Sequence, residues 1–308
     1  MVKADAYNHG VNKVAPFTES MVDRFGVATV KEGMWLRKLG ITKPISVFNY
    51  LSHECKKVID YSLTPVAYNF DTLRSILSGG IKDFDLKIDS GMNRFGFKSI
   101  DEVETLQKLL RSSNVTPRVI HTHFAGEESI SKQIKRFEDL VKPLAHLGLP
   151  RCASATNGIK RGFYMDGVRA GLIAYEGGLK ATSEIIVVKN VLKGERIGYD
   201  YEYTAKADEK IAVICGGYYD GIMRAYSGAC VTVNGSTCPI IGKVSMDTAI
   251  IKLNTDAVVG DRVTIWDKDT INDFANSANA TVYEVITSIK GRCERKYYHG
   301  QTRDKTTC

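Results

Sequence analysis

The sequence FDLKIDSGMNRFGFKSIDEVETLQKLLR, residues 84–111, contains the pattern that decides the fold. It opens with a short apolar run, Phe84–Asp89, which is typical of a buried strand. A helical pattern follows over Asp101–Arg111, where the apolar residues on one face are Val103, Leu106, Leu109 and Leu110. A strand followed by an amphipathic helix, when repeated, predicts parallel strands joined by crossover helices.

The same unit recurs through the first half of the chain. A second amphipathic helix is predicted over Ser131–Leu147. The predicted strands are Phe25–Val30, Pro44–Phe48, Thr64–Tyr68, Phe84–Asp89, Arg118–His123, Arg151–Ser154 and Gly167–Gly171. With a stub at Val2 these would make eight strands, so we predict an α/β barrel of the eight-stranded TIM type with a truncated first strand. Because the stub is too short for a barrel strand, we expect an N-terminally shortened version of a longer protein.

The pattern changes after about Gly177 to short alternating strands separated by turn residues. These strands are predicted at Glu184–Val191, Ile211–Cys215, Ala229–Val233, Ile240–Val244, Thr248–Lys252 and Arg262–Trp266. Asn234-Gly235 is a strong hairpin signal, and Asn272–Asn279 is the main helical segment of this half. We therefore predict two domains, an α/β barrel over residues 1–177 and a mostly β domain over residues 178–308.

Composition narrows the class of protein. The 308 residues carry a net charge of +7 that is spread along the chain, which does not indicate nucleic acid. No apolar run is long enough to cross a bilayer, and no secretory leader opens the chain. Seven scattered cysteines without a C-x-x-C pair argue against disulfides and a zinc site. We expect a cytoplasmic protein with no metal and no membrane partner.

The opening stretch Val2-Lys3-Ala4-Asp5-Ala6-Tyr7-Asn8-His9-Gly10 carries the first chemical signal. A lysine at a strand end, with its stem in an apolar site, loses its proton more easily and can form an imine with an aldehyde. The alternative is a flexible, charged N-terminus. The stretch resembles the cofactor-lysine motif of alanine racemases, which bind pyridoxal 5'-phosphate (PLP). This resemblance implies that Lys3 carries the cofactor and that Tyr7 lies beside it.

The residues 86–96 place Lys87 and Asp89 on one face of a barrel strand, with Arg94 in the loop that follows. Read alone, they could be a buried salt bridge and a solvated arginine. They resemble the racemase motif whose arginine, here Arg94, contacts the cofactor and the substrate carboxylate. In many members the lysine at the position of Lys87 is carbamylated and holds that arginine.

Three later strand ends resemble further cofactor motifs. His123 corresponds to the histidine that orients the catalytic tyrosine, and Arg169 to the arginine facing the pyridine nitrogen. Gly171 and Leu172 would approach the phosphate, because barrels often bind phosphate after their last strands. In Ala153–Gly158, Thr156 is the best match for the phosphate-binding serine, although Cys152 stands where the family usually has histidine. The alternatives are a core histidine, a surface arginine and an ordinary helix cap.

The second half contains tyrosine-rich segments that would ordinarily be packing or edge residues. Their resemblance to racemase motifs assigns Tyr199 as the second acid/base and Tyr218 as a substrate-side residue. The run Gly242–Asp247 resembles the family's Gly-Arg-x-Cys-Met-Asp, so the N–H of Met246 would bind the substrate carboxylate. Tyr283 corresponds to the tyrosine that reaches the phosphate.

Together these motifs imply a PLP-dependent alanine racemase that interconverts L- and D-alanine by two bases, supplying D-alanine for the cell wall. In this family the active sites are shared in a homodimer. A serine or broad-specificity racemase, and an inactive truncated homologue that binds PLP, remain alternatives. A decarboxylase would need an acidic residue where Arg169 stands, and non-catalytic PLP-binding proteins typically lack the β domain.

Overall fold

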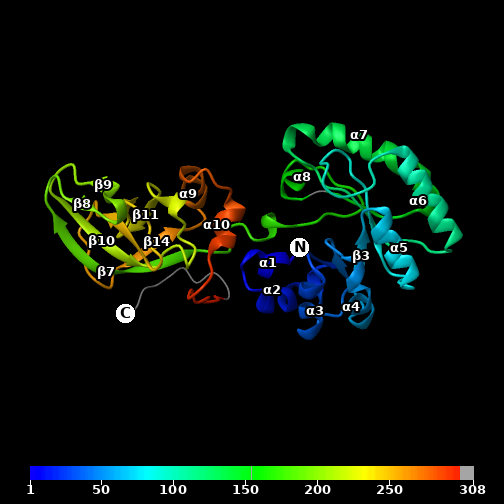
Figure 1. Ribbon diagram of the computed structural model, residues 1–308, viewed down its shortest axis with the longest axis horizontal. Coiled ribbons are helices and arrows are strands. Elements are labelled where there is room, and N and C mark those ends of the chain that lie inside the picture. Colours follow the sequence, from blue (N-terminus) through cyan, green and yellow to red (C-terminus); the bar gives the residue numbers. More distant parts are fainter. Residues whose placement is uncertain (154, 299–308) are drawn as a thin grey trace. The chain divides into compact units, whose positions relative to one another are not determined.

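The computed structural model describes residues 1–153 and 155–298 and divides into two compact units, Met1–Tyr175 and Glu176–Cys308. Ser154, the last residue of one predicted strand, and the chain beyond residue 298 lie outside the described residues. Figure 1 follows the chain through both units by colour. Among the described residues, no helix is both long and apolar enough to span a membrane.

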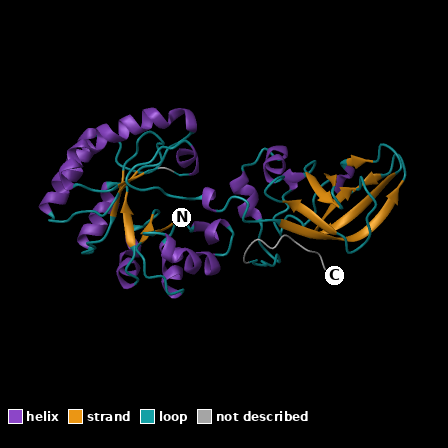
Figure 2. Ribbon diagram, turned by 180° about the vertical axis from the view of Figure 1, so that it is seen from behind, coloured by secondary structure: helices purple, strands orange, loops and turns teal. Residues whose placement is uncertain are grey.

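Six parallel strands in chain order form the sheet of the first unit. They are β1 (Phe25–Val27), β2 (Ile45–Val47), β3 (Thr64–Ala67), β4 (Asp85–Lys87), β5 (Ile120–His121) and β6 (Arg151–Cys152). Helix α2 (Val11–Thr18) precedes β1, and α8 (Thr156–Lys160) follows β6. The helices between the strands are α3 (Val30–Lys38), α4 (Cys55–Asp60), α5 (Phe70–Ser78), α6 (Ile100–Ser112) and α7 (Ile130–Val141). In Figure 2 the purple helices of this unit lie around its orange strands. The predicted alternation of strand and helix is confirmed.

The described part of this sheet has six strands and is not the closed eight-stranded barrel that was predicted. The predicted strand Gly167–Gly171 is wrong as a strand, because within the described chain it forms one isolated bridge, between Gly167 and Cys152. At the stub, the Val2 N–H donates to the Gly26 carbonyl at 2.9 Å, and the Met1 nitrogen donates to the Ala170 carbonyl at 2.8 Å. A single residue cannot form a ladder of hydrogen bonds with a neighbouring strand. The structure therefore shows a parallel half-barrel, and residues 167–171 and the stub at Val2 join it only through isolated hydrogen bonds.

Helix boundaries follow from local capping. Ser99 and Glu102 form a capping box at the start of α6, where Val103, Leu106 and Leu110 are buried against the sheet. The predicted helix Ser131–Leu147 is too long, because α7 ends at Val141 and a 3-10 segment, Lys142–Leu147, follows. Pro143 lies at the start of that segment and cannot donate a helical backbone hydrogen bond.

The second unit is a closed antiparallel barrel with the strand order β10-β13-β12-β11-β14-β7. Its strands are β7 (Ala181–Val191), β10 (Glu209–Cys215), β11 (Cys230–Val233), β12 (Ser236–Ile241), β13 (Thr248–Lys252) and β14 (Arg262–Trp266), beside a small pair, β8 (Arg196–Ile197) and β9 (Tyr203–Thr204). The predicted hairpin is confirmed, with φ of 46° at Asn234 and 79° at Gly235 between β11 and β12.

Two helices follow the barrel strands. The predicted helix Asn272–Asn279 is found as α9 (Ile271–Ser277). A further helix, α10 (Val282–Ser288), was not predicted, although Thr281 and Glu284 form a capping box at its start. That spacing was the available sequence signal for the helix that carries Tyr283.

Candidate active site

The C-terminal ends of the parallel strands gather the predicted cofactor residues of the first unit. His123 follows β5, Arg94 follows β4, and Thr156 follows β6. Because parallel strands all point the same way, the loops after them lie at one rim of the sheet. Lys3 joins this rim through the hydrogen bond from Val2 to Gly26 in β1.

The segment that carries Lys3 has an unusual backbone. The five residues from Ala4 to Asn8 all have positive φ, between 51° and 66°, within the element α1 (Lys3–Tyr7). This left-handed conformation costs roughly 1–2 kcal/mol per non-glycine residue. The Asp5 carboxylate accepts the Val11 N–H at 2.7 Å, and the Glu32 carboxylate accepts the Ala4 N–H at 2.8 Å. Strain that the surroundings hold in place is typical of functional sites.

The electrostatic surroundings of Lys3 favour its neutral form. Burial of the stem lowers the pKa of Lys3, and the nearby Arg94 guanidinium lowers it further. Glu32 acts in the opposite direction. As a whole residue, Lys3 is exposed at the rim. A neutral, accessible amine is the form that can react with an aldehyde.

Arg169 and His123 form a hydrogen-bonded pair beside this lysine. The Arg169 guanidinium donates to His123 Nδ1 at 2.9 Å and to the backbone carbonyls of Ala153 and Thr122. Arginine can only donate, so Nδ1 is the acceptor and His123 carries its proton on Nε2. Burial, then Arg169, lowers the pKa of His123 to about 3, so the ring is neutral at physiological pH.

Phe48 was not predicted as a site residue, yet it supports Arg169. Its ring centroid lies 5.2 Å below the guanidinium and 5.1 Å from the ring of His121. Sequence inspection had no signal for this contact, because Phe48 reads as the apolar end of a strand. The aromatic ring fixes the arginine from one side while carbonyls fix it from another.

A cradle of small groups lies next to Tyr7. A Cβ built on Gly171 would stand 2.8 Å from the Tyr7 hydroxyl, so only glycine fits there without displacement. Thr156, buried at the start of α8, accepts a hydrogen bond from the N–H of Ile173 at 3.2 Å. Leu172, the residue after Gly171, is also buried. The structure thus brings the predicted phosphate residues Thr156, Gly171 and Leu172 close to Tyr7, which was predicted to lie beside the cofactor.

The alternative reading of Lys87 and Asp89, a buried salt bridge between them, is not found among the described residues. The Asp89 carboxylate instead accepts the N–H groups of Gly91, Asn93 and Arg94 at 2.9, 3.0 and 3.1 Å. It therefore fixes the loop that presents Arg94. Lys87 is buried, and burial, then Arg169 and Arg94, lowers its pKa well below the usual range.

This rim suits an anionic cofactor. Lys3, Lys87, Arg94 and Arg169 place four basic side chains within one another's electrostatic influence. The Nε of Arg169 is buried without a hydrogen-bond partner in the described part of the chain. The two arginines beside a glycine cradle fit a phosphate-bearing group such as PLP.

The predicted residues of the second unit lie on neighbouring loops. Tyr199 is 63% exposed in the 3-10 segment Tyr199–Tyr201. The Tyr218 N–H donates to the Ser245 carbonyl at 3.0 Å, which places Tyr218 beside the loop of the half-exposed Met246. Lys243 donates to Asp200 at 2.5 Å and so joins the Tyr199 segment to the same loop. Tyr283 is partly exposed on α10.

An ion-pair network that sequence inspection missed holds these loops. Arg292 binds the carboxylate of Asp220 through Nε at 3.0 Å and Nη2 at 2.7 Å, and it pairs with Asp247 at 2.9 Å. Asp220 is buried and also accepts the Gly217 N–H at 3.1 Å. These contacts fix the two loops that carry Tyr218 and Met246.

Two family models match consecutive parts of this chain. The model described as "Alanine racemase, N-terminal domain" matches residues 1–178, and the one described as "Alanine racemase, C-terminal domain" matches residues 179–297. The chain belongs to the alanine racemase family. An alanine racemase of Actinobacillus succinogenes is 34% identical over 96% of this chain and 91% of its own length. The relative from Aquifex aeolicus is 32% identical over 96% and 90%.

Solved structures of the family have the same fold. The biosynthetic alanine racemase of Pseudomonas aeruginosa aligns with a TM-score of 0.88 at 26% identity, over 97% of this chain and 91% of that one. The Clostridium difficile enzyme aligns with a TM-score of 0.84 at 29% identity, over 94% and 85%. The racemase fold thus unites the parallel half-barrel with the β barrel, as the sequence motifs implied.

Proposed function

We propose that this member of the alanine racemase family interconverts L- and D-alanine with PLP and two proton-transferring residues. The observation that carries the proposal is the lowered pKa of Lys3, which lies beside Arg169, His123 and the Gly171 cradle. D-alanine formed in this way would supply cell-wall synthesis in the cytoplasm.

PLP joined to the amino group of alanine makes the Cα proton acidic by delocalising the charge that its removal leaves. Lys3 would hold the cofactor and then remove or return that proton from one face. Tyr7, Thr156, Gly171 and Leu172 would bind the phosphate, with Tyr283 beside them. Arg169 would face the pyridine nitrogen, and because it cannot give up a proton it would leave that nitrogen unprotonated.

The opposite face needs a second acid/base. Tyr199 is exposed on its own unit, and Lys243 holds its segment. In a homodimer the partner subunit's Tyr199 would reach the substrate opposite Lys3, so inversion would need no rotation of the substrate. His123 carries its proton on Nε2, where it can donate to that tyrosine. Arg94, Tyr218 and the Met246 N–H would hold the substrate carboxylate.

Two variants test the acid/base assignment. Lys3→Ala should abolish both racemisation and the visible absorbance of bound cofactor. Tyr199→Phe should keep that absorbance and lose at least roughly a hundredfold in rate, since a positioned acid/base contributes 10²–10⁴-fold. Undiminished turnover of both alanine enantiomers by Tyr199→Phe would overturn the two-base arrangement.

Lys87 is proposed to be carbamylated. Its buried amine has a strongly lowered pKa and forms no hydrogen bond in the described structure, so it is available to add carbon dioxide. The product is an anion that can accept hydrogen bonds from Arg94. Labelled bicarbonate should give one protein-bound carbonyl carbon signal in NMR, and the signal should be absent from Lys87→Ala.

Serine is the competing substrate. Both amino acids present the same amine and carboxylate to the residues named above, so the assignment to alanine follows from the family. Comparing kcat/KM for the two amino acids on one preparation decides it, and a higher value for serine would reverse it.

A further inference from the structure

A cavity lined by both basic and apolar residues lies at the opposite end of the strands from the candidate active site. Its volume is about 620 Å³, which falls within the usual size of small-molecule sites. Arg24 precedes β1, Thr64 begins β3, and Arg118 precedes β5. The active-site residues follow the other ends of these parallel strands, so the cavity is separate from the PLP site.

The charges around this cavity do not balance. Its basic residues are Arg24, Arg37, Lys82 and Arg118. The carboxylates that pair with them are Asp83, bound to Arg118, and Asp85, bound to Arg24 at 3.0 Å. Arg37 donates only to backbone carbonyls, including those of Ile41 and Ser62, and Glu19 is the carboxylate that acts on it through charge. Four basic residues therefore face three carboxylates, Asp83, Asp85 and Glu19. A net positive cavity favours an anionic ligand.

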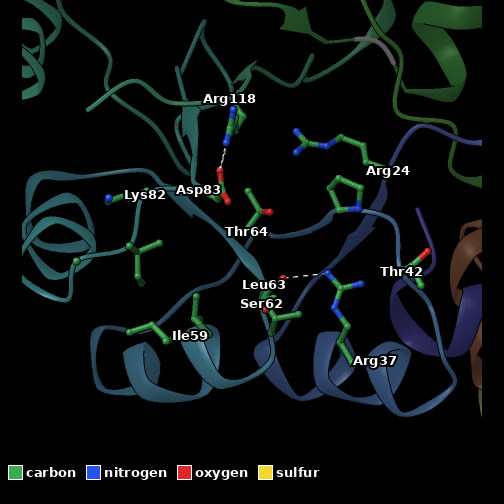
Figure 3. Close-up of a pocket in the computed structure, with 14 residues that line it drawn as sticks. Arg24, Arg37, Thr42, Ile59, Ser62, Leu63, Thr64, Lys82, Asp83 and Arg118 are labelled. Carbon is green, nitrogen blue, oxygen red and sulfur yellow. Dashed lines mark hydrogen bonds and ion pairs between the residues drawn. The ribbon is translucent and has the colours of Figure 1, made fainter. Parts of the chain in front are cut away.

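Two arginines have donors to spare for such a ligand. Arg24 uses Nη1 for Asp85, and within the described chain its Nε and Nη2 have no partner. Arg118 uses Nε and Nη2 for Asp83, which leaves Nη1. In Figure 3 the two guanidiniums reach toward the same part of the cavity, whereas the Lys82 side chain extends away from it.

Thr64 adds an independent observation. The residue is only 5% exposed, and its hydroxyl has no hydrogen bond to another described residue. Figure 3 shows Thr64 in the cavity below Asp83 and the two arginines. The hydroxyl oxygen is accessible from the cavity, so it can donate a hydrogen bond to a bound anion.

The remaining walls are apolar. Pro44, Val58, Ile59, Leu63 and Ile81 line the cavity beside the arginines. We propose that this cavity binds a phosphate monoester with a small apolar body, its phosphate held by Arg24, Arg118 and Thr64. Arg24 can pair with the phosphate through two parallel N–H bonds, from Nε and Nη2, and Arg118 can add a bond from Nη1. The apolar wall receives the organic part.

Calorimetric titration of the PLP-loaded protein with phenyl phosphate tests the site. The wild type should bind one equivalent per chain, and saturating alanine should leave the affinity unchanged. Arg118→Gln and Thr64→Val should each weaken binding at least roughly tenfold, the effect of one lost hydrogen bond to a charged group. Lys82→Gln, the matched loss of one charge at the same cavity, should stay within about twofold of wild type.

Several results would overturn the site. The first is that the wild type shows no saturable binding of phenyl phosphate, and the second is that alanine displaces it. The third is that Arg118→Gln and Lys82→Gln weaken its binding equally. Inorganic phosphate should bind more weakly than phenyl phosphate, and equal affinity would refute the role of the apolar wall. Arg24→Gln is avoided because it would leave the fully buried Asp85 without its cation. Unchanged circular dichroism would show that each variant folds.

Discussion

Lowering the pH from 6 to 5 should destabilise the first unit through two buried histidines, His121 and His123. Burial lowers the pKa of His121 to about 4 against the opposing effect of its bond to Asp85. Burial, then Arg169, lowers the pKa of His123 to about 3. Lys87 also faces both rings and opposes a second charge there.

The sign follows from proton binding. In the unfolded chain a histidine has a pKa near 6.5, so below that pH the unfolded state binds more protons than the folded state. The free energy of unfolding therefore falls with falling pH until the folded-state pKa values are reached. The pKa of Asp85 is lowered, so its contribution is lost only at more acidic pH. Burial, then Arg169, lowers the pKa of the Met1 amino group to about 6, so this group adds a smaller loss in the same window. The two histidines contribute most of the loss between pH 6 and pH 5.

The expected size is worked from these pKa values. Each histidine contributes up to roughly 1.4 kcal/mol per pH unit where only its unfolded form is protonated. Between pH 6 and pH 5 the unfolded histidine is mostly protonated, so the pair should remove roughly 2 kcal/mol from the free energy of unfolding. Most domains have a free energy of unfolding of only about 5–15 kcal/mol, so a loss of this size is easily measured.

Urea unfolding of the cofactor-free protein at both pH values, followed by circular dichroism, measures this loss. His121→Asn and His123→Asn should each reduce the pH dependence by about half, whatever they do to stability at pH 7. His53→Asn is the matched control, because His53 is exposed and should leave the pH dependence unchanged. A wild-type loss below roughly 0.5 kcal/mol, or an equal loss in the double variant, would refute the reasoning.

Two further substitutions test the loops around the site. Gly171→Ala would place a Cβ 2.8 Å from the Tyr7 hydroxyl and should lower PLP affinity roughly tenfold, as overpacking of about 1–3 kcal/mol implies. Fluorescence titration with PLP measures this affinity. Gly126→Ala is the control, because a Cβ on Gly126 meets no atom within 4 Å, and equal PLP affinities of the two variants would contradict the role of Gly171. Arg292→Lys loses the two-pronged contact with Asp220 and should raise KM for alanine several-fold with a smaller change in kcat, and an unchanged KM in steady-state kinetics would refute this role.

The sequence determined the alternation of elements and the identity of the motifs. Apolar periodicity was sufficient for α6, and the Asn234-Gly235 pair was sufficient for the β11–β12 hairpin. These features depend on neighbouring residues, so they can be recognised locally. The order of the motifs then indicated the family, and the two family models bear this out.

Only the tertiary structure decided how the site is held. The left-handed backbone at Ala4–Asn8 depends on Glu32, which is distant in sequence, and Asp89 fixes the Arg94 loop instead of pairing with Lys87. Phe48, which follows β2, meets Arg169, which lies about 120 residues further along the chain in a segment without a regular strand. Such contacts join residues far apart in the chain, and their geometry exists only once the strands have assembled, so no local pattern could predict them.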